Sequence, residues 1–183
     1  QTIDEDSSLT LTLSASDVDA DALTFSASAD HASTSVDGST LTVTPDADFN
    51  GNLEVTVFAS DGNGGEGSNS FVLTVTPVND APVVVAIDPQ TVAEDSSLTL
   101  ELSASDVDEN DITFGVYVDS GSATVDGSTL TVIPDQDFNG NIEVTVSAND
   151  GTLSGTTSFT LTVTSVNDAP IIASISDQGI DED

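Results

Sequence analysis

The sequence predicts an all-β protein built from two tandem seven-stranded β-sandwiches joined end to end. Three observations predict this fold. The chain contains an internal repeat of about 89 residues, its apolar residues alternate with polar ones, and turn-forming pairs separate the short alternating stretches. We find no apolar pattern of the 3.6-residue period that is typical of an amphipathic helix.

The repeat consists of sequence blocks that return at a nearly constant offset. Residues 5–11 (EDSSLTL) recur at residues 94–100, which is 89 residues further on. After Gly62 the offset falls to 88, and residues 78–82 (VNDAP) recur at residues 166–170. We therefore expect a first repeat at residues 1–80 with a truncated N-terminal strand, a second at residues 81–168, and the start of a third at residues 169–183.

Each expected strand is a short stretch in which every second residue is apolar. Such alternation is typical of strands that bury one face. In the first repeat these stretches are residues 9–15, 23–27, 41–43, 53–59 and 71–75, and a further first strand is expected at residues 83–87 of the second repeat. About seven strands in roughly 90–100 residues predict an immunoglobulin-like β-sandwich.

The charge of the chain excludes several classes of function. It has 33 Asp and Glu residues and no Lys, Arg or Cys, so its formal net charge is -33. Such a chain cannot neutralise phosphates, which excludes nucleic-acid binding and direct binding to an anionic membrane surface. It also lacks the lysine, arginine and thiolate groups of most phosphoryl-transfer and covalent enzymes, and we expect no enzymatic activity.

Many of the acidic residues fall in loops that the predicted fold brings together. If each strand crosses the long axis once, alternate loops lie at opposite poles of a repeat. We call these the N-terminal pole, where the chain enters, and the C-terminal pole, where it leaves. The following acids of repeat 1, the linker and repeat 2 then converge on one junction: Glu5, Asp46 and Asp48; Asp80; and Asp106, Asp108 and Asp150.

Such convergence requires a cation. Two like charges ~4 Å apart cost roughly 4 kcal/mol at an effective dielectric constant of 20. Because no Lys or Arg is available, a hard divalent cation is the expected partner. Carboxylate and carbonyl oxygens without sulfur favour Ca²⁺ over transition metals. The sequence therefore predicts Ca²⁺ at the repeat junction.

The same loops resemble motifs of the cadherin family. Residues 15–19 (ASDVD) resemble the cadherin Asp-x-Asp motif, and residues 46–48 (DAD) resemble its Asp-x-Glu motif. Residues 58–62 (FASDG) are similar to the stretch before the last cadherin strand, and residues 78–82 (VNDAP) are similar to the cadherin linker. In composition and spacing the chain most resembles the cadherin-like tandem repeats of giant bacterial secreted adhesins of the RTX type.

This resemblance implies calcium between successive domains. The implied junction ligands are Glu5, Asp46, Asp48, Asn79, Asp80, Asp106, Asp108 and Asp150. Weaker or partial sets are expected at the two outer poles: Asp17, Asp19 and Asp61 at one, and Glu94, Asp135, Asp137, Asn167 and Asp168 at the other. Ala81 stands where the cadherin linker has an Asn, so one amide ligand is absent, and we expect one to three ions.

The leading functional hypothesis is mechanical. We expect calcium-rigidified spacer domains of a large secreted or cell-surface adhesin, with neighbouring repeats of the same chain as partners and the isolated piece monomeric. The alternative is a calcium-dependent binding module for polysaccharide or for homophilic cell–cell adhesion. The chain has no Trp and a single Tyr, which disfavours sugar stacking.

Overall fold

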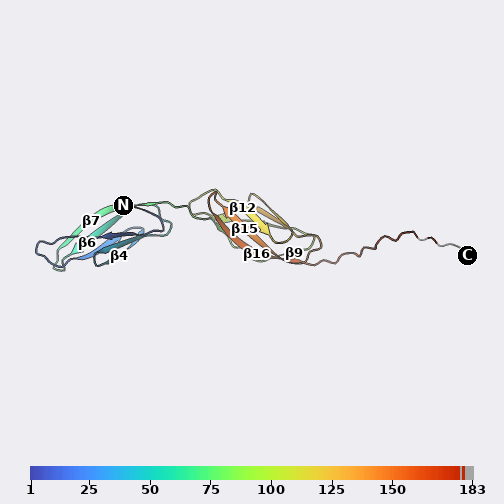
Figure 1. Cartoon of the computed structure of the whole chain (residues 1–183), viewed down its shortest axis with the longest axis horizontal. Coiled ribbons are helices and arrows are strands. Elements are labelled where there is room, and N and C mark those ends of the chain that lie inside the picture. Colours follow the sequence, from blue (N-terminus) through green and yellow to red (C-terminus); the bar gives the residue numbers. More distant parts are fainter. Residues whose placement is uncertain (178, 180–183) are drawn as a thin grey trace. The chain divides into compact units, whose positions relative to one another are not determined.

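The computed structural model describes residues 1–177 and 179, and every regular element in that part of the chain is a β-strand (Figure 1). The chain divides into two compact units, unit 1 (Gln1–Asp80) and unit 2 (Ala81–Asp183). The start of a third repeat is predicted at residues 169–183, of which residues 178 and 180–183 lie outside the described residues. In the described part, no helix has the length and apolar character needed to cross a membrane.

Unit 1 is a sandwich of two sheets. The four-stranded sheet has the order β1-β7-β6-β3, and the three-stranded sheet has the order β2-β5-β4. Strands β1 and β7 are parallel, whereas all other pairs are antiparallel. The strand bounds are β1 Thr2–Asp4, β2 Leu9–Thr12, β3 Thr24–Ala29, β4 Ala32–Asp37, β5 Thr40–Pro45, β6 Gly51–Ser60 and β7 Glu66–Thr76.

Unit 2 repeats this topology with one addition. Its sheets have the orders β12-β15-β16-β9 and β10-β14-β13, and a short pair β11-β8 extends the sandwich. The bounds are β8 Val83–Val84, β9 Gln90–Ala93, β10 Leu98–Glu101, β11 Ala104–Ser105, β12 Thr113–Val118, β13 Ser122–Asp126, β14 Thr129–Ile133, β15 Gly140–Asn149 and β16 Ser154–Thr164. The predicted fold class, two tandem seven-stranded immunoglobulin/cadherin-like sandwiches, is confirmed.

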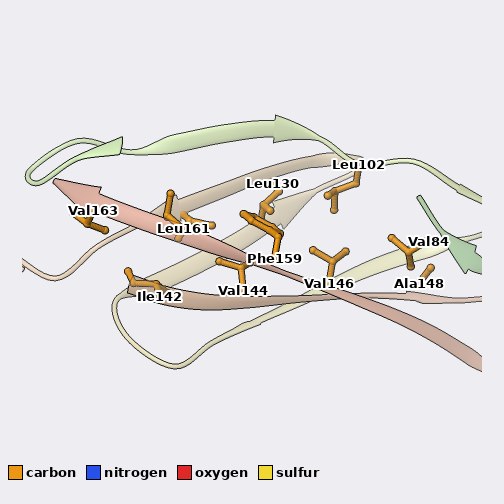
Figure 2. Close-up of a cluster of buried hydrophobic side chains, with 11 residues drawn as sticks. Val84, Leu102, Leu130, Ile142, Val144, Val146, Ala148, Phe159, Leu161 and Val163 are labelled. Carbon is orange, nitrogen blue, oxygen red and sulfur yellow. The ribbon is translucent and has the colours of Figure 1, made fainter. Parts of the chain in front are cut away.

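The cores form because one face of each strand is apolar. Leu41 and Val43 in unit 1 and their counterparts Leu130 and Val132 in unit 2 are completely buried, whereas the Thr residues between them are partly exposed. Figure 2 shows the unit 2 core, in which side chains from several strands point into the space between the sheets. Alternate residues are buried because successive side chains of a strand point to opposite faces of the sheet.

The first strand of unit 2 differs from the expectation. Of the strand predicted at residues 83–87, only residues 83–84 form a strand, β8, and a second strand that was not predicted, β9, follows at residues 90–93 and pairs in a different sheet. Strand β8 is antiparallel to β11, and β9 is parallel to β16. Pro89 lies immediately before β9, and because it has no N–H it cannot donate a ladder hydrogen bond.

Alternate loops lie at opposite poles within each unit. At the C-terminal pole of unit 1, Asp46 N–H donates to His31 O (2.9 Å), and the rings of His31 and Phe49 stack 5.2 Å apart. At the N-terminal pole, Leu13 N–H donates to Ser39 O (2.7 Å). The loop geometry assumed for the acidic residues is therefore present in the fold.

Candidate metal centre

A buried glutamate organises the C-terminal pole of each unit. Glu5 is 3% exposed and Glu94 is 5% exposed, and among the described residues they are the buried charged side chains. Glu5 Oε1 accepts a hydrogen bond from Val78 N–H (2.5 Å), and its own N–H donates to Thr76 O (2.9 Å). Glu5 therefore joins the loop after β1 to the segment that leaves β7.

Three aspartates from separate segments at the same pole form a compact carboxylate cluster. Asp6, Asp48 and Asp80 each place a carboxylate oxygen within 4.8 Å of the other two; we call this set triad 1. Asp6 follows Glu5, Asp48 lies in the loop between β5 and β6, and Asp80 lies beyond β7. The triad thus joins three separate segments of unit 1.

The backbone of these loops favours aspartate. Asp6 and Asp48 have positive φ angles of 59° and 57°, which Asp tolerates better than most residues. Asp48 N–H donates to Asp6 Oδ1 at 3.5 Å, and Phe49 N–H closes a turn onto Asp46 O at 3.2 Å. The turn directs Asp48, rather than Asp46, into the triad.

Unit 2 builds the same centre from its own residues. Asp95, Asp137 and Asp168 have carboxylate oxygens within 4.8 Å of one another; we call this set triad 2. Glu94 Oε1 accepts a hydrogen bond from Val166 N–H (2.5 Å), and Asp137 N–H donates to Asp95 Oδ1 (3.5 Å). The arrangement of Glu5 and triad 1 is therefore reproduced contact by contact.

Desolvation and the repulsion between neighbouring carboxylates disfavour the ionised form in triad 2. Desolvation, followed by the negative charges of Asp137, Asp95 and Glu94, raises the pKa of Asp168 above its usual value. No Lys or Arg exists in the sequence to offset these charges. A bound cation would remove this penalty, since it favours the ionised carboxylate.

Asp6 and Asp95 were not among the predicted ligands. A signal for them was present, because the pair Glu5-Asp6 recurs as Glu94-Asp95 at the repeat offset. Predicted ligands Asp46 and Asp135 lie outside the two triads. The Asp135 carboxylate accepts hydrogen bonds from Gly121 N–H (3.2 Å) and the Ser120 hydroxyl (3.3 Å).

The predicted amide ligands lie next to the triads. Asn79 Nδ2 donates to Asp80 O, and Asn167 Nδ2 donates to Asp168 O, both at 3.1 Å. Each Asn thereby orders the backbone of the neighbouring aspartate.

In the acidic loops at the N-terminal poles, one aspartate side chain accepts hydrogen bonds from the backbone of its own loop. Asp17 Oδ1 accepts hydrogen bonds from Asp19 N–H (2.8 Å) and Asp21 N–H (3.3 Å), and Asp106 Oδ1 accepts them from Asp108 N–H (3.0 Å) and Asn110 N–H (3.3 Å).

In the hairpin loops at these poles, an aspartate side chain likewise accepts hydrogen bonds from backbone N–H groups of the same loop. Asp61 Oδ1 accepts hydrogen bonds from Asn63 N–H (2.7 Å) and Gly65 N–H (2.9 Å), which lowers the pKa of Asp61. Asp150 Oδ1 likewise accepts them from Thr152 N–H and Leu153 N–H, both at 2.6 Å. In unit 1, Asp17 and Asp61 line the same groove.

One carboxylate oxygen at the N-terminal pole of unit 2 is buried without a hydrogen bond. Asp106 Oδ2 has no hydrogen-bond partner within residues 1–177 and 179. A buried carboxylate oxygen normally has a partner, and a cation can supply one.

The donor sets fit a calcium ion. Oxygens that share one Ca²⁺ at 2.3–2.6 Å can lie up to about 5 Å apart, and the oxygens of each triad meet this limit. All of these donors are oxygens, which Ca²⁺ prefers and which zinc sites seldom use alone. Each triad offers three of the six to eight oxygens that Ca²⁺ takes, with carbonyl, amide and water oxygens as the usual remainder.

The fold and its acidic loops define a tandem of immunoglobulin-like β-sandwich domains. The family described as "Bacterial Ig domain" matches residues 1–76 and 79–164, and the chain belongs to this family. Ig-like and cadherin-like domains are typically non-enzymatic and usually extracellular. No curated protein matches the sequence.

Among solved structures, the chain is similar to human protocadherin-24 EC1-2. The identity is 16%, the match covers 85% of this chain and 88% of the other, and the TM-score is 0.50. Drosophila N-cadherin EC1-3 matches with 15% identity, coverage of 82% and 57%, and a TM-score of 0.43. The expected resemblance to cadherins is thus confirmed for the fold.

Another match is the endo-fucoidan hydrolase MfFcnA4 from glycoside hydrolase family 107. The identity is 20%, the match covers 88% of this chain, and the TM-score is 0.37. The chain spans about a quarter of that protein's length, since the match covers 26% of it.

Proposed function

We propose that the two units are calcium-rigidified spacer domains of a secreted or cell-surface adhesin. The observation that carries the proposal is the repetition of one carboxylate centre, triad 1 and triad 2, at the C-terminal poles of both units. Each centre takes its last member, Asp80 or Asp168, from the segment that leaves the sandwich. An ion bound there holds the start of the linker against its own domain.

Ligation of the same ions by the next domain would fix the domain orientation. Only Ala81 separates Asp80 from Pro82, so the two Cα atoms are at most about 7 Å apart. Within unit 2, residues 83 and 105 are paired, which puts the Asp106 loop beside the point where the chain enters. We propose that Asp106, Asp108 and Asp150 complete the site that Glu5, Asn79 and the triad 1 residues Asp6, Asp48 and Asp80 begin.

Metal removal would then loosen the tandem. Without Ca²⁺ the acids of adjoining poles repel each other, and the linker bends freely. Extracellular modules bind Ca²⁺ with dissociation constants of ~10⁻⁴–10⁻³ M, so millimolar Ca²⁺ outside a cell would occupy the sites. Millimolar Ca²⁺ is then about 1–10 times the dissociation constant and adds about 0.4–1.4 kcal/mol per site to domain stability.

Small-angle scattering in Ca²⁺ and in EDTA tests the proposal. We expect a longer maximum dimension and a narrower distribution of shapes in Ca²⁺, and loss of this difference in Asp80→Asn. Asp37→Asn is the matched control, because Asp37 is the exposed last residue of β4, at the other pole of unit 1. Scattering curves that do not change on chelation would overturn the spacer mechanism, and calorimetry without a heat of Ca²⁺ binding would overturn the metal site itself.

A further inference from the structure

The sequence contains three Asn-Gly pairs, and the fold places them in two different environments. The pairs are Asn50-Gly51, Asn63-Gly64 and Asn139-Gly140. In such a pair, glycine has no Cβ, so its backbone nitrogen can approach the side-chain amide of the preceding asparagine closely. Each pair is therefore a chemical candidate for loss of that amide, and the local structure decides which pair can react.

Two of the pairs are held by hydrogen bonds and by strand pairing. Their asparagine side chains contact the buried glutamates, Asn50 Nδ2 donating to Glu5 Oε2 and Asn139 Nδ2 donating to Glu94 Oε2, both at 3.5 Å. Their glycines are the first residues of β6 and β15, ten-residue strands in the interior of each four-stranded sheet. A reaction between side chain and backbone requires this end of the strand to open, so both pairs are protected while the units are folded.

The third pair lies in the hairpin loop between β6 and β7 of unit 1. Asn63 and Gly64 are exposed and belong to no strand, and glycine occupies four of the six positions 62–67. Gly64 has a φ angle of 107°, and a Cβ there would meet nothing within 4 Å. The backbone at this pair therefore has the room and the conformational freedom to bring the Gly64 nitrogen to Asn63 Cγ.

The equivalent hairpin of unit 2 lacks the pair. It is one residue shorter and has Thr152 and Leu153 at the positions of Asn63 and Gly64. Both of these residues are exposed, so the tip of the hairpin is open to solvent in each unit. Unit 2 is therefore an internal control that has the same turn between the same strands without the reactive pair.

The Asn63 side chain joins two loops at the N-terminal pole of unit 1. Its Nδ2 donates a hydrogen bond to Asp21 Oδ2 at 3.0 Å, across 42 positions of the sequence. Asp21 lies in the loop between β2 and β3, and its own N–H donates to Asp17 Oδ1 at 3.3 Å. The Asn63 amide is thus a donor that holds an acidic loop against the hairpin.

We propose that Asn63 deamidates spontaneously in the folded chain and that its product loosens these two loops. The Gly64 nitrogen attacks Asn63 Cγ, a C–N bond forms, and the Cγ–Nδ2 bond breaks. The amide nitrogen leaves as ammonia and carries away the proton that Gly64 loses. Water then opens the resulting succinimide at either carbonyl, which leaves an aspartate or an isoaspartate at position 63.

The product cannot make the contact to Asp21. An ionised carboxylate only accepts hydrogen bonds, whereas the amide nitrogen of Asn63 donates one. Two like charges then replace a donor and an acceptor, and they repel each other. An isoaspartate also adds a carbon atom to the backbone of the hairpin. The change accumulates with time, and it is independent of the proposed calcium function.

Incubation of the folded chain at pH 7, followed by peptide mass spectrometry, tests the reaction. Cleavage after glutamate isolates residues 55–66, in which Asn63 is the only asparagine. We expect this fragment to gain the mass of one amide-to-acid conversion, while Asn50 and Asn139 react about tenfold more slowly or less because their strands must open first. In urea the three pairs should react at similar rates. No mass gain in residues 55–66, or equal rates at the three pairs in the folded chain, would overturn the proposal.

Variants of the hydrogen-bonded pair test the loosening. Asn63→Thr installs the residue of unit 2 and should abolish the mass gain. Asn63→Asp should match the aged chain, with faster hydrogen exchange of the Asp19 and Asp21 N–H groups, which donate to Asp17. Adding Asp21→Asn should restore slow exchange, because it reverses donor and acceptor of the same hydrogen bond. Exchange in Asn63→Asp equal to that of the fresh wild type would contradict the loosening of the loops.

Discussion

The backbone nitrogen of Val78 donates a hydrogen bond to Glu5 Oε1 over 2.5 Å, and these residues are 73 positions apart in the sequence. Val166 and Glu94 make the equivalent contact at the same distance. A charged acceptor that is almost completely buried thus fixes the point at which each chain segment leaves its sandwich. The hydrogen bonds of Glu5 and the position of the triad 1 carboxylates therefore depend on the same segments.

Replacement of this glutamate should destabilise unit 1. Glu5→Ala leaves the Val78 N–H without its acceptor, and hydrogen bonds to charged groups contribute about 1.5–3 kcal/mol. We expect a loss of that size in the free energy of unfolding of unit 1, measured by urea denaturation. Glu54→Ala is the control, since Glu54 is exposed on β6 and should change the stability little. Equal losses in both variants would contradict the role assigned to Glu5.

Asp6 should matter more to calcium affinity than Asp46. Asp6 belongs to triad 1, whereas Asp46 lies outside it and its carbonyl closes the turn onto Phe49. We expect Asp6→Asn to weaken Ca²⁺ binding in unit 1 by about tenfold or more, which is about 1.4 kcal/mol. Asp46→Asn should have a smaller effect. Isothermal calorimetry measures both, and the reverse order of effects would show that triad 1 is not the centre of the site.

Much of the fold could be predicted from particular residues. Leu41 and Val43 alternate with Thr and are buried, and the repeat carries the same prediction to Leu130 and Val132. The separate strands β8 and β9 could not be predicted as readily, because an apolar stretch does not show which of two sheets it joins.

The candidate site was predicted in outline. Strand alternation assigns loops to poles, which is sufficient to gather Asp48 and Asp80 at one pole. It does not give the direction of a side chain within a turn. Asp6 and Asp48 have positive φ angles and contribute carboxylates to the triad. These angles depend on the local backbone conformation rather than on the spacing of the residues in the sequence.

Asp168 should make the metal-free chain sensitive to pH. Its pKa is raised in the folded state, chiefly by desolvation and then by Asp137, Asp95 and Glu94. Between the usual value of 3.8 and the raised value, the folded chain binds more protons than the unfolded chain. Its contribution to stability therefore falls as pH rises through this window, and the loss persists at neutral pH.

Asp168→Asn removes this contribution. In EDTA at pH 7 we expect the variant to melt at a higher temperature than the wild type, and the difference should vanish below pH 3.8. In Ca²⁺ the order should reverse, because the variant lacks a ligand. Asp126→Asn, at the exposed last residue of β13 in unit 2, should follow the wild type throughout. A variant that is less stable in EDTA at pH 7 would contradict the assigned charge repulsion.

The two units should unfold separately, with unit 1 first. Leu41 and Leu130 occupy equivalent positions and are both completely buried, so Leu→Ala removes the same group from each core. Such a change costs about 2–5 kcal/mol. The core of unit 1 buries less apolar surface than the core of unit 2. Leu13, Val57 and Phe71 are half-buried, whereas their counterparts Leu102, Val146 and Phe159 are buried. In calorimetry of dilute chain in EDTA, Leu41→Ala should lower the first transition alone and Leu130→Ala the second alone. A shift of the upper transition by Leu41→Ala would mean that the core of unit 1 is the more stable one, and that its half-buried residues cost the unit little stability.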